Sequence, residues 1–316
     1  MEITLVFRSE SIHYGAAQIR LLAREFRSLA LHSLSGFSLP IRCSVICSAA
    51  MELPGKVAIV TGSGGEGSGR AEALRLASEG CRLVVSDINE SGGNETVRRI
   101  TQAGGKAAFC RCDVSRSNEV RALVAFAEQT FSGLEILINN ASGPGYKPGA
   151  PPEEWLATIE VDLLGAIYGM QFALPAMRKR GGGAIVNVSS TSALTHGPDH
   201  SQMTPYDIAK IGALRMTTTL SALRETDNIR VNCLVPHWLA ATEVKAYFDS
   251  LTPEERRKNP RIPSKLIELD EVAQAVIRLI TDEGLAGRVL ILWDGPRTEL
   301  ISATDPGYAS TEPYKL

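Results

Sequence analysis

The chain has 316 residues, of which 44% are hydrophobic and 22% charged, and its formal net charge is −2. This composition is ordinary for a soluble globular protein, and the length allows two domains or one large α/β domain. A charge so close to zero provides no basic field for nucleic acid or anionic lipid. No apolar run is long enough to cross a bilayer. We therefore expect no nucleic-acid partner and no membrane partner.

The six cysteines are spread thinly along the chain, which fits a reducing, cytoplasmic compartment. Cys110 and Cys112 would face the same side of a strand. No Cys or His pair at metal-ligand spacing accompanies them, so we expect no metal site.

Residues 1–50 differ from the rest because they carry arginine but no lysine and only three acids. Arg20, Arg24 and Arg27 would follow one face of a helix, a pattern typical of an organellar transit peptide. The alternative is an over-extended translation start, since translation could instead begin at Met51, shortly before the first expected strand. In either case we expect a domain over residues 51–296, flanked by this extension and by a tail over 297–316.

From residue 56 onward, apolar runs alternate with helical patterns. The expected strands are 57–61, 82–87, 106–113, 135–141, 184–190, 229–236 and 288–294. The expected helices are 68–79, 91–102, 118–130, 153–178, 204–225 and 270–281. Strands rich in Val, Ile and Leu on both faces indicate a parallel sheet covered by helices on each side. The pattern predicts a single α/β domain of the doubly wound Rossmann type with seven parallel strands, whose ligand crevice lies at the carboxyl ends of the strands.

A glycine cluster, "TGSGGEGSGR", separates the first expected strand from the first expected helix. A Walker A loop would need Lys and then Ser or Thr after its last glycine, but Ser68 and Gly69 follow Gly67. A purely structural loop remains an alternative. The position before a helix favours a bound anion, and hence a dinucleotide phosphate.

Asp87 ends the second expected strand, 18 positions after Gly69. An acid at this place typically binds the ribose 2′-hydroxyl of a dinucleotide, although Asp87 as the N-cap of the next helix is an alternative. Because a carboxylate repels a 2′-phosphate, the sequence favours NAD over NADP.

A possible chemical centre follows the fifth expected strand. The strand ends in "NVSS", which places the hydroxyls of Ser189 and Ser190 at the carboxyl edge of the sheet. Further on, "YDIAK" places Tyr206 and Lys210 one turn apart on the same helix face.

With these motifs in this order, the chain resembles the short-chain dehydrogenase/reductase family over roughly residues 51–295. The matching motifs are Thr61-Gly62 with Gly67 and Gly69, Asp87, "CDV" at 112–114, "NNA" at 139–141, "NVSS" at 187–190, Tyr206 with Lys210, "RVN" at 230–232 leading to Pro236, and "DG" at 294–295.

The resemblance implies an NAD(P)-dependent oxidoreductase that interconverts a secondary alcohol and a ketone, in a dimer or tetramer of identical chains. Tyr206 would exchange a proton with the substrate oxygen, Ser190 would hydrogen-bond that oxygen, and Lys210 would hold the nicotinamide ribose and favour the tyrosinate. The remaining implied cofactor contacts are Gly62, Gly67, Gly69, Asp87, Asp113, Val114 and Asn140.

Four departures from the family pattern accompany this match. The glycine loop holds four residues between Gly62 and Gly67 where three are usual, Ser142 replaces a glycine, and His237 replaces the glycine after Pro236. Asp162 stands where the family commonly has an asparagine that holds a proton-relaying water near Lys210. Asp accepts hydrogen bonds only and adds a negative charge, which predicts a higher pH optimum. A surface Asp without a role is the alternative.

Two other functions remain open at this stage. A dinucleotide-binding regulator or pseudoenzyme would explain the departures, and an NADP-linked carbonyl or 3-oxoacyl-thioester reductase would differ mainly at Asp87. Trp238, Tyr247 and Phe248 suggest an apolar wall of a substrate lid, although packing of the lid would use the same residues.

Overall fold

The computed structural model describes residues 51–143, 149–194, 203–259, 262–294 and 298–301. These residues contain one sheet of eight strands. The strands are β1 (Val57–Thr61), β2 (Arg82–Asp87), β3 (Lys106–Arg111), β4 (Ile136–Asn139), β5 (Gly183–Val188), β6 (Ile229–Pro236), β7 (Val289–Leu292) and β8 (Thr298–Leu300). They lie in the order β3-β2-β1-β4-β5-β6-β7-β8. Residues 1–50, with their two interpretations, lie outside the described residues.

The first seven strands are parallel, as the sequence predicts, and their order reverses between β1 and β4. The eighth strand corrects the prediction of a seven-stranded sheet: β8 pairs with β7 in the antiparallel direction, with Leu292 opposite Thr298. Its three residues are all exposed, so no buried apolar run marks it in the sequence. The sheet therefore continues past residue 296.

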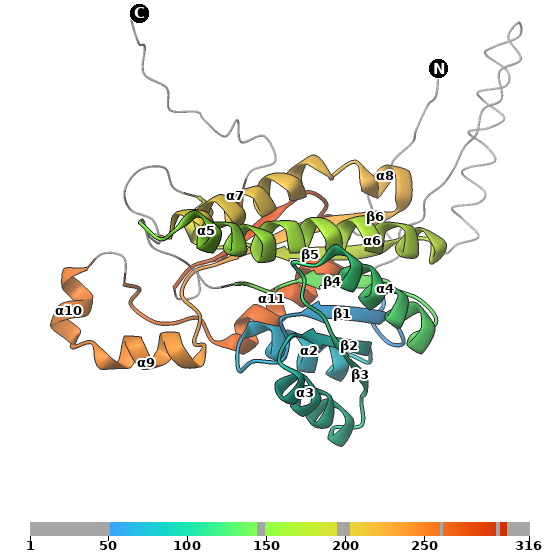
Figure 1. The fold of residues 1–316 in the computed structure, drawn as a ribbon, viewed down its shortest axis with the longest axis horizontal. Coiled ribbons are helices and arrows are strands. Elements are labelled where there is room, and N and C mark those ends of the chain that lie inside the picture. The colour runs from blue at the N-terminus through green and yellow to red at the C-terminus, as the bar shows by residue number, and fades with distance from the viewer. Residues whose placement is uncertain (1–50, 144–148, 195–202, 260–261, 295–297, 302–316) are drawn as a thin grey trace, which may run out of the picture. The chain divides into compact units, whose positions relative to one another are not determined.

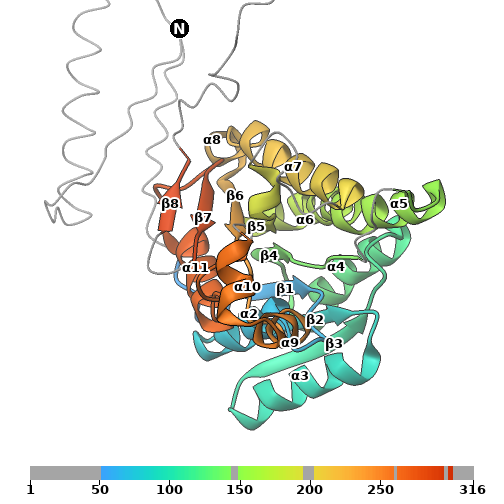
Figure 2. The same cartoon turned by 90° about the vertical axis from the view of Figure 1, so that its left-hand side faces the viewer.

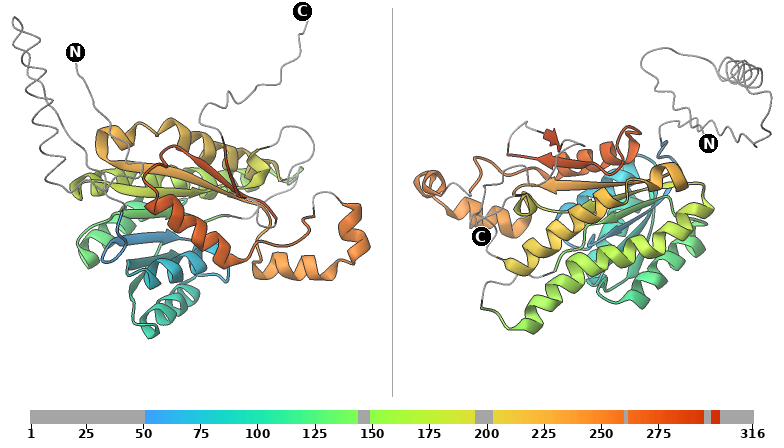
Figure 3. Two further views of the ribbon diagram at one scale, coloured as in Figure 1. Left: turned by 180° about the vertical axis from the view of Figure 1, so that it is seen from behind. Right: turned by 90° about the horizontal axis from the view of Figure 1, so that it is seen from above.

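Helices cover both faces of the sheet. They are α2 (Ser68–Ser78), α3 (Glu90–Gln102), α4 (Ser117–Phe131), α5 (Pro152–Ile159), the π-helix η1 (Glu160–Leu164), α6 (Gly165–Lys179), the 3₁₀ helix η2 (Thr191–Ala193), α7 (Thr204–Thr219), α8 (Leu223–Asp227), α9 (Thr242–Ser250), α10 (Pro253–Lys258) and α11 (Leu269–Thr281). One apolar core joins α2 and α11 to the sheet, and a second joins α4 and α6 to its other face. Figure 2 shows these two layers, and Figure 3 shows α4, α6 and α7 side by side. No helix among the described residues is long and apolar enough to span a membrane.

Two expected helices are interrupted. The run 153–178 contains the π-helical turn η1, and the run 204–225 ends at Thr219 before the short helix α8. Thr217, Thr218 and Thr219 each donate a side-chain hydrogen bond to a carbonyl one turn earlier. Such β-branched residues have low helix propensity, and their hydroxyls compete for the backbone, which accounts for the end of α7.

The carboxyl ends of the parallel strands meet at one edge of the sheet. This edge carries Thr61 of β1, Asp87 of β2, Asn139 of β4 and Val188 of β5. Helices α9 and α10, which the sequence analysis did not predict, project beyond this edge in Figure 1.

Candidate active site

Two glycines of the loop after β1, Gly62 and Gly69, leave no room for a side chain. Gly62 has a φ of +68°, and a Cβ on it would lie 2.7 Å from the Cα of Ala141. A Cβ on Gly69 would lie 2.3 Å from the carbonyl oxygen of Gly62. Contacts this short exclude any side chain, so Gly62 and Gly69 are required by the geometry of the loop itself.

Asn140 holds this loop in place. Its Nδ2 donates to the carbonyl oxygens of Thr61 at 2.9 Å and Gly62 at 3.2 Å. Its Oδ1 accepts from Ser68 Oγ at 2.7 Å. The side chain that the resemblance places near the adenosine ribose is therefore engaged within the protein, where it connects β1, β4 and α2.

Arg70 ties the enlarged loop to α3 and was not singled out in the sequence analysis. It is 5% exposed, and its Nε donates to Thr96 Oγ1 at 2.8 Å. One terminal nitrogen donates to the carbonyls of Gly64 at 2.8 Å and Gly92 at 3.0 Å, and the other pairs with Glu66. The four-residue spacing of Glu66 and Arg70 was the available sequence signal.

The N-terminus of α2 is open. Its N-cap is Gly67, which has no side chain to cap the helix, and its first turn has no acidic residue. A Cβ on Gly67 would meet nothing within 4 Å. Unpaired amides at a helix N-terminus form an anion site, so this end can hold a phosphate group.

Asp87 faces the loop from the end of β2. Its Oδ2 accepts from Gly64 N at 2.7 Å, and its Oδ1 accepts from Asn89 N at 2.9 Å. The N-cap of α3 is Asn89, whose side chain accepts from Gly92 N. The alternative that Asp87 is this N-cap is therefore wrong, and the carboxylate keeps lone pairs for a further donor.

Asp113 and Val114 follow the end of β3. Asp113 Oδ1 accepts from the backbone nitrogen of Ser115 at 3.0 Å and from its hydroxyl at 2.7 Å. Val114 is buried, and a Cβ on Gly165 would lie 2.9 Å from its Cγ2. Val114 thus packs the end of β3 against the start of α6.

Hydrogen bonds of Ser189 and Lys210 fix helix α7 to the end of β5. Ser189 Oγ donates to the carbonyl of Lys210 at 2.7 Å, and Lys210 Nζ donates to the carbonyl of Val188 at 3.2 Å. Lys210 Nζ lies 5.2 Å from the centre of the Tyr206 ring. Ser190 Oγ accepts from Ser192 N at 3.3 Å and caps η2.

Asp162 forms a buried ion pair with Lys210. The two side chains are 0% and 4% exposed, and Asp162 Oδ2 lies 3.5 Å from Lys210 Nζ. The alternative of a surface Asp is therefore wrong. Burial alone would lower the pKa of Lys210, but the charges of Asp162 and Tyr206 outweigh it and raise that pKa above its ordinary value. Lys210 therefore stays a cation.

Two further groups hold the Asp162 carboxylate, which sits on the π-helical turn η1. Ser142 Oγ donates to Oδ2 at 2.8 Å, and Gly143 N donates to Oδ1 at 2.5 Å. π-Helical turns are rare and concentrate at functional sites.

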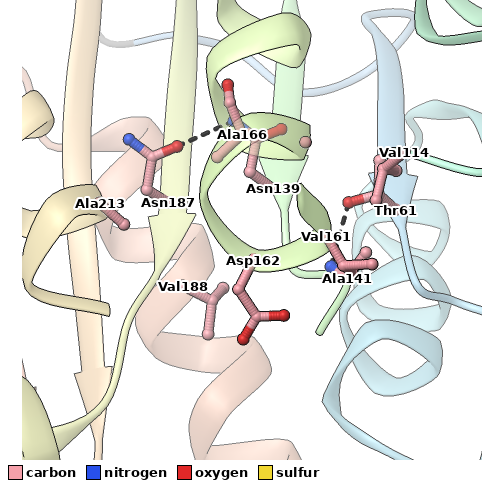
Figure 4. A pocket seen from close by; sticks show the side chains of 11 residues that line it. Thr61, Val114, Asn139, Ala141, Val161, Asp162, Ala166, Asn187, Val188 and Ala213 are labelled. Carbon is pink, nitrogen blue, oxygen red and sulfur yellow. Dashed lines mark hydrogen bonds between the residues drawn. The ribbon is translucent and has the colours of Figure 1, made fainter. Parts of the chain in front are cut away.

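A small cavity of about 10 Å³ lies beside Asp162 and is shown in Figure 4. It is lined by Thr61, Val114, Asn139, Ala141, Val161, Asp162, Gly165, Ala166, Asn187, Val188 and Ala213. This volume is close to what one water molecule needs. The Asp162 position can thus hold a single water.

His237 follows β6 on the same edge. Burial lowers its pKa, although the charge of Asp294 acts in the opposite direction. Its ring centre lies 6.1 Å from that of Trp293. A largely neutral imidazole is therefore expected at this position near neutral pH.

The expected lid aromatics divide between two roles. Phe248 is buried with Ile262 and Leu266, so it packs the lid. Tyr247 is about half exposed, and its ring centre lies 6.0 Å from that of Trp238. Tyr247 and Trp238 are the lid aromatics that remain available to line a pocket.

Comparison with known proteins gives a consistent assignment. The chain matches the short chain dehydrogenase family over residues 56–251. It is 36% identical to the short chain dehydrogenase/reductase astE of Aspergillus oryzae, over 73% of this chain and 89% of that protein. It is 32% identical to 7α-hydroxysteroid dehydrogenase of Escherichia coli K12, over 79% of this chain and 97% of that protein.

A solved structure agrees with these sequence matches. A 7α-hydroxysteroid dehydrogenase in complex with NADH and 7-oxo glycochenodeoxycholic acid superposes with a TM-score of 0.69 at 31% identity, covering 77% of this chain and 95% of that chain. The chain belongs to the short-chain dehydrogenase/reductase family. It is an oxidoreductase that acts on CH–OH groups with a nicotinamide dinucleotide.

Proposed function

We propose that this protein interconverts a secondary alcohol and a ketone with NAD, and that Tyr206 is the general acid and base. The observation that carries the proposal is the buried Asp162–Lys210 pair beside the Tyr206 ring at the carboxyl end of β5. An ammonium group held next to a phenol favours the tyrosinate, which can take a proton from an alcohol.

The residues present fit a dinucleotide. The uncapped N-terminus of α2 and the open space over Gly67 suit the pyrophosphate, with Gly62 and Gly69 shaping the loop. Asp87 suits the ribose hydroxyls, since its carboxylate retains acceptor capacity. We assign the adenine end to Asp113 and Val114, and a loop-ordering role to Asn140. When bound, the nicotinamide supplies or accepts the hydride.

The chain's own residues then transfer the proton and orient the substrate oxygen. In the oxidation direction Tyr206 takes the proton of the alcohol, and in the reduction direction it returns that proton to the carbonyl oxygen. Ser190 orients this oxygen through a hydrogen bond. Lys210, kept charged by Asp162, orients the nicotinamide ribose and stabilises the tyrosinate.

We assign NAD rather than NADP as the physiological cofactor because of Asp87. An uncompensated carboxylate beside the ribose repels the 2′-phosphate of NADP. The substrate class that we propose is a cyclic secondary alcohol, since 7α-hydroxysteroid dehydrogenase of Escherichia coli is a relative over most of its length.

The test is turnover by the full-length chain with NAD or NADP and a 7α-hydroxy bile acid or cyclohexanol, followed by the absorbance of reduced nicotinamide. We expect turnover with NAD. Tyr206→Phe should abolish it, and the control Tyr168→Phe, at a partly buried position packed against the apolar core, should retain it. NAD binding without any turnover on a wider alcohol panel would instead favour a dinucleotide-binding regulator. Faster turnover with NADP would contradict the role of Asp87.

We also propose that the chain forms a homo-oligomer through α5 and α7. Leu156, Ile208 and Ile211 on these helices are large apolar side chains exposed to solvent. Light scattering after size exclusion should give a dimer or tetramer, and Ile208→Lys should shift it toward the monomer. A monomeric wild type would contradict this assignment.

A further inference from the structure

The enlarged glycine loop carries an acid of its own, Glu66, beside two arginines. We infer that Glu66 is a cofactor-specificity residue, which disfavours NADP by neutralising Arg70 and Arg99. This inference rests on the proposed binding of a nicotinamide dinucleotide at this loop.

Arg70 has only one charged partner among the described residues. Its other hydrogen bonds go to neutral oxygens, the Thr96 hydroxyl and the carbonyls of Gly64 and Gly92. Neutral acceptors leave the guanidinium charge uncompensated. Glu66 Oε1 is the group that balances it.

Arg99 shares the same carboxylate oxygen. Its terminal nitrogen lies 3.1 Å from Glu66 Oε1, and its Nε lies 2.8 Å from Glu95 Oε1. One oxygen of Glu66 thus contacts both guanidinium groups. Glu95 also pairs with Arg98, so its single negative charge is shared between Arg98 and Arg99.

Gly64 connects this charge cluster to the proposed ribose site. Its N–H donates to Asp87 Oδ2 at 2.7 Å, while its carbonyl accepts from Arg70 at 2.8 Å. Asp87 and Arg70 therefore both contact Gly64, one at its N–H and the other at its carbonyl oxygen. A phosphate on the ribose 2′-oxygen would need a cation there, and arginine is the side chain best suited to bind it.

Glu66 prevents Arg70 and Arg99 from serving as that cation. Any phosphate would have to compete with a carboxylate that already neutralises them. Replacing Glu66 by Gln keeps the shape and the acceptor oxygen but removes the charge. Arg70 then loses its charged partner and Arg99 keeps only Glu95, so both can attract a 2′-phosphate more strongly. The affinity for NADP relative to NAD should then rise about tenfold, the range of one charge-assisted hydrogen bond.

The test is isothermal titration calorimetry of the full-length chain with NAD and NADP separately. Glu66→Gln should raise the ratio of the NAD dissociation constant to the NADP dissociation constant about tenfold. Glu95→Gln is the matched control, because it removes an equal charge from the same Arg99 without touching the loop. We expect this control to leave the ratio unchanged.

An unchanged ratio in Glu66→Gln and also in Glu66→Ala would overturn the inference, as would an equal rise in Glu95→Gln. The side chain of Glu66 is 58% exposed, so neither substitution disturbs the core, and thermal unfolding verifies this. A wild-type chain that binds neither dinucleotide would instead contradict the proposed function, and the inference would fail with it.

Discussion

Ser142 Oγ donates a hydrogen bond of 2.8 Å to Asp162 Oδ2, the same oxygen that faces Lys210 Nζ at 3.5 Å. Sequence comparison marks Ser142 and Asp162 as two separate departures from the family pattern. In the structure they form one unit, in which a serine supplies a donor to the carboxylate that replaces an amide. The extra charge at position 162 and the extra hydroxyl at position 142 therefore compensate each other.

Removal of the Ser142 hydroxyl should reveal this coupling. Ser142→Ala leaves a buried carboxylate with one donor fewer, which should lower the free energy of unfolding by about 1–3 kcal/mol. A double-mutant cycle with Asp162→Asn, measured by urea unfolding, should give a non-additive result because Ser142 and Asp162 are in contact. Ser192→Ala is the control: its Oγ is buried but has no partner among the described residues, so its loss should cost little. Additive effects would contradict the coupling.

Asp162→Asn should also change the pH dependence of the reaction. Asp162 is what keeps the pKa of Lys210 high against burial, so its neutralisation lowers that pKa. Lys210 then loses its charge earlier as the pH rises, and the alkaline limb of the kcat/KM profile should move to lower pH. Asp249→Asn, an exposed residue paired with Lys245, serves as the control. An alkaline limb that stays in place in Asp162→Asn would refute this role.

The fold was predictable from the sequence because buried parallel strands form continuous apolar runs. β1 and β6 have the predicted bounds, since each residue in them is buried on one face or the other. β8 was not predicted because its three residues are all exposed and form no buried apolar run. The π-helical turn η1 was also missed, since its residues continue the helical period of α5 and α6.

The arrangement of the candidate site was predictable wherever a motif has a fixed spacing along the chain. Tyr206 and Lys210 fall on one helix face, and their proximity in space follows directly. The ion pair of Glu66 with Arg99 and the hydrogen bond of Arg70 with Thr96 join the loop to α3 across a long separation in sequence. Tertiary contacts of this kind leave no periodic signal, so only the structure identifies them.

The glycines of the loop should respond differently to alanine. A Cβ on Gly67 meets open space, so Gly67→Ala should keep the melting temperature yet weaken NAD binding, because the methyl group enters the proposed pyrophosphate site. A Cβ on Gly69 would overlap the Gly62 carbonyl, so Gly69→Ala should lower the melting temperature as well. Thermal unfolding with and without NAD separates the two effects. Equal losses of stability in both variants would argue against this geometry.

Glu72 is a buried carboxyl group on α2 that the proposed reaction does not use. It is 1% exposed, and neither of its oxygens has a hydrogen-bond partner among the described residues. Burial raises its pKa from 4.5 to about 8. The folded chain therefore holds a proton that the unfolded chain releases above pH 4.5.

This difference makes the stability of the protein depend on pH in a defined direction. The contribution of Glu72 is fully present below pH 4.5 and is lost as the pH rises toward about 8. The free energy of unfolding should fall by up to about 1.4 kcal/mol per pH unit in this interval. Urea unfolding across the interval should show that Glu72→Gln removes this slope, whereas the partly exposed control Glu79→Gln retains it. A slope that persists in Glu72→Gln would mean that the carboxyl group reaches water or a counter-charge in the folded chain.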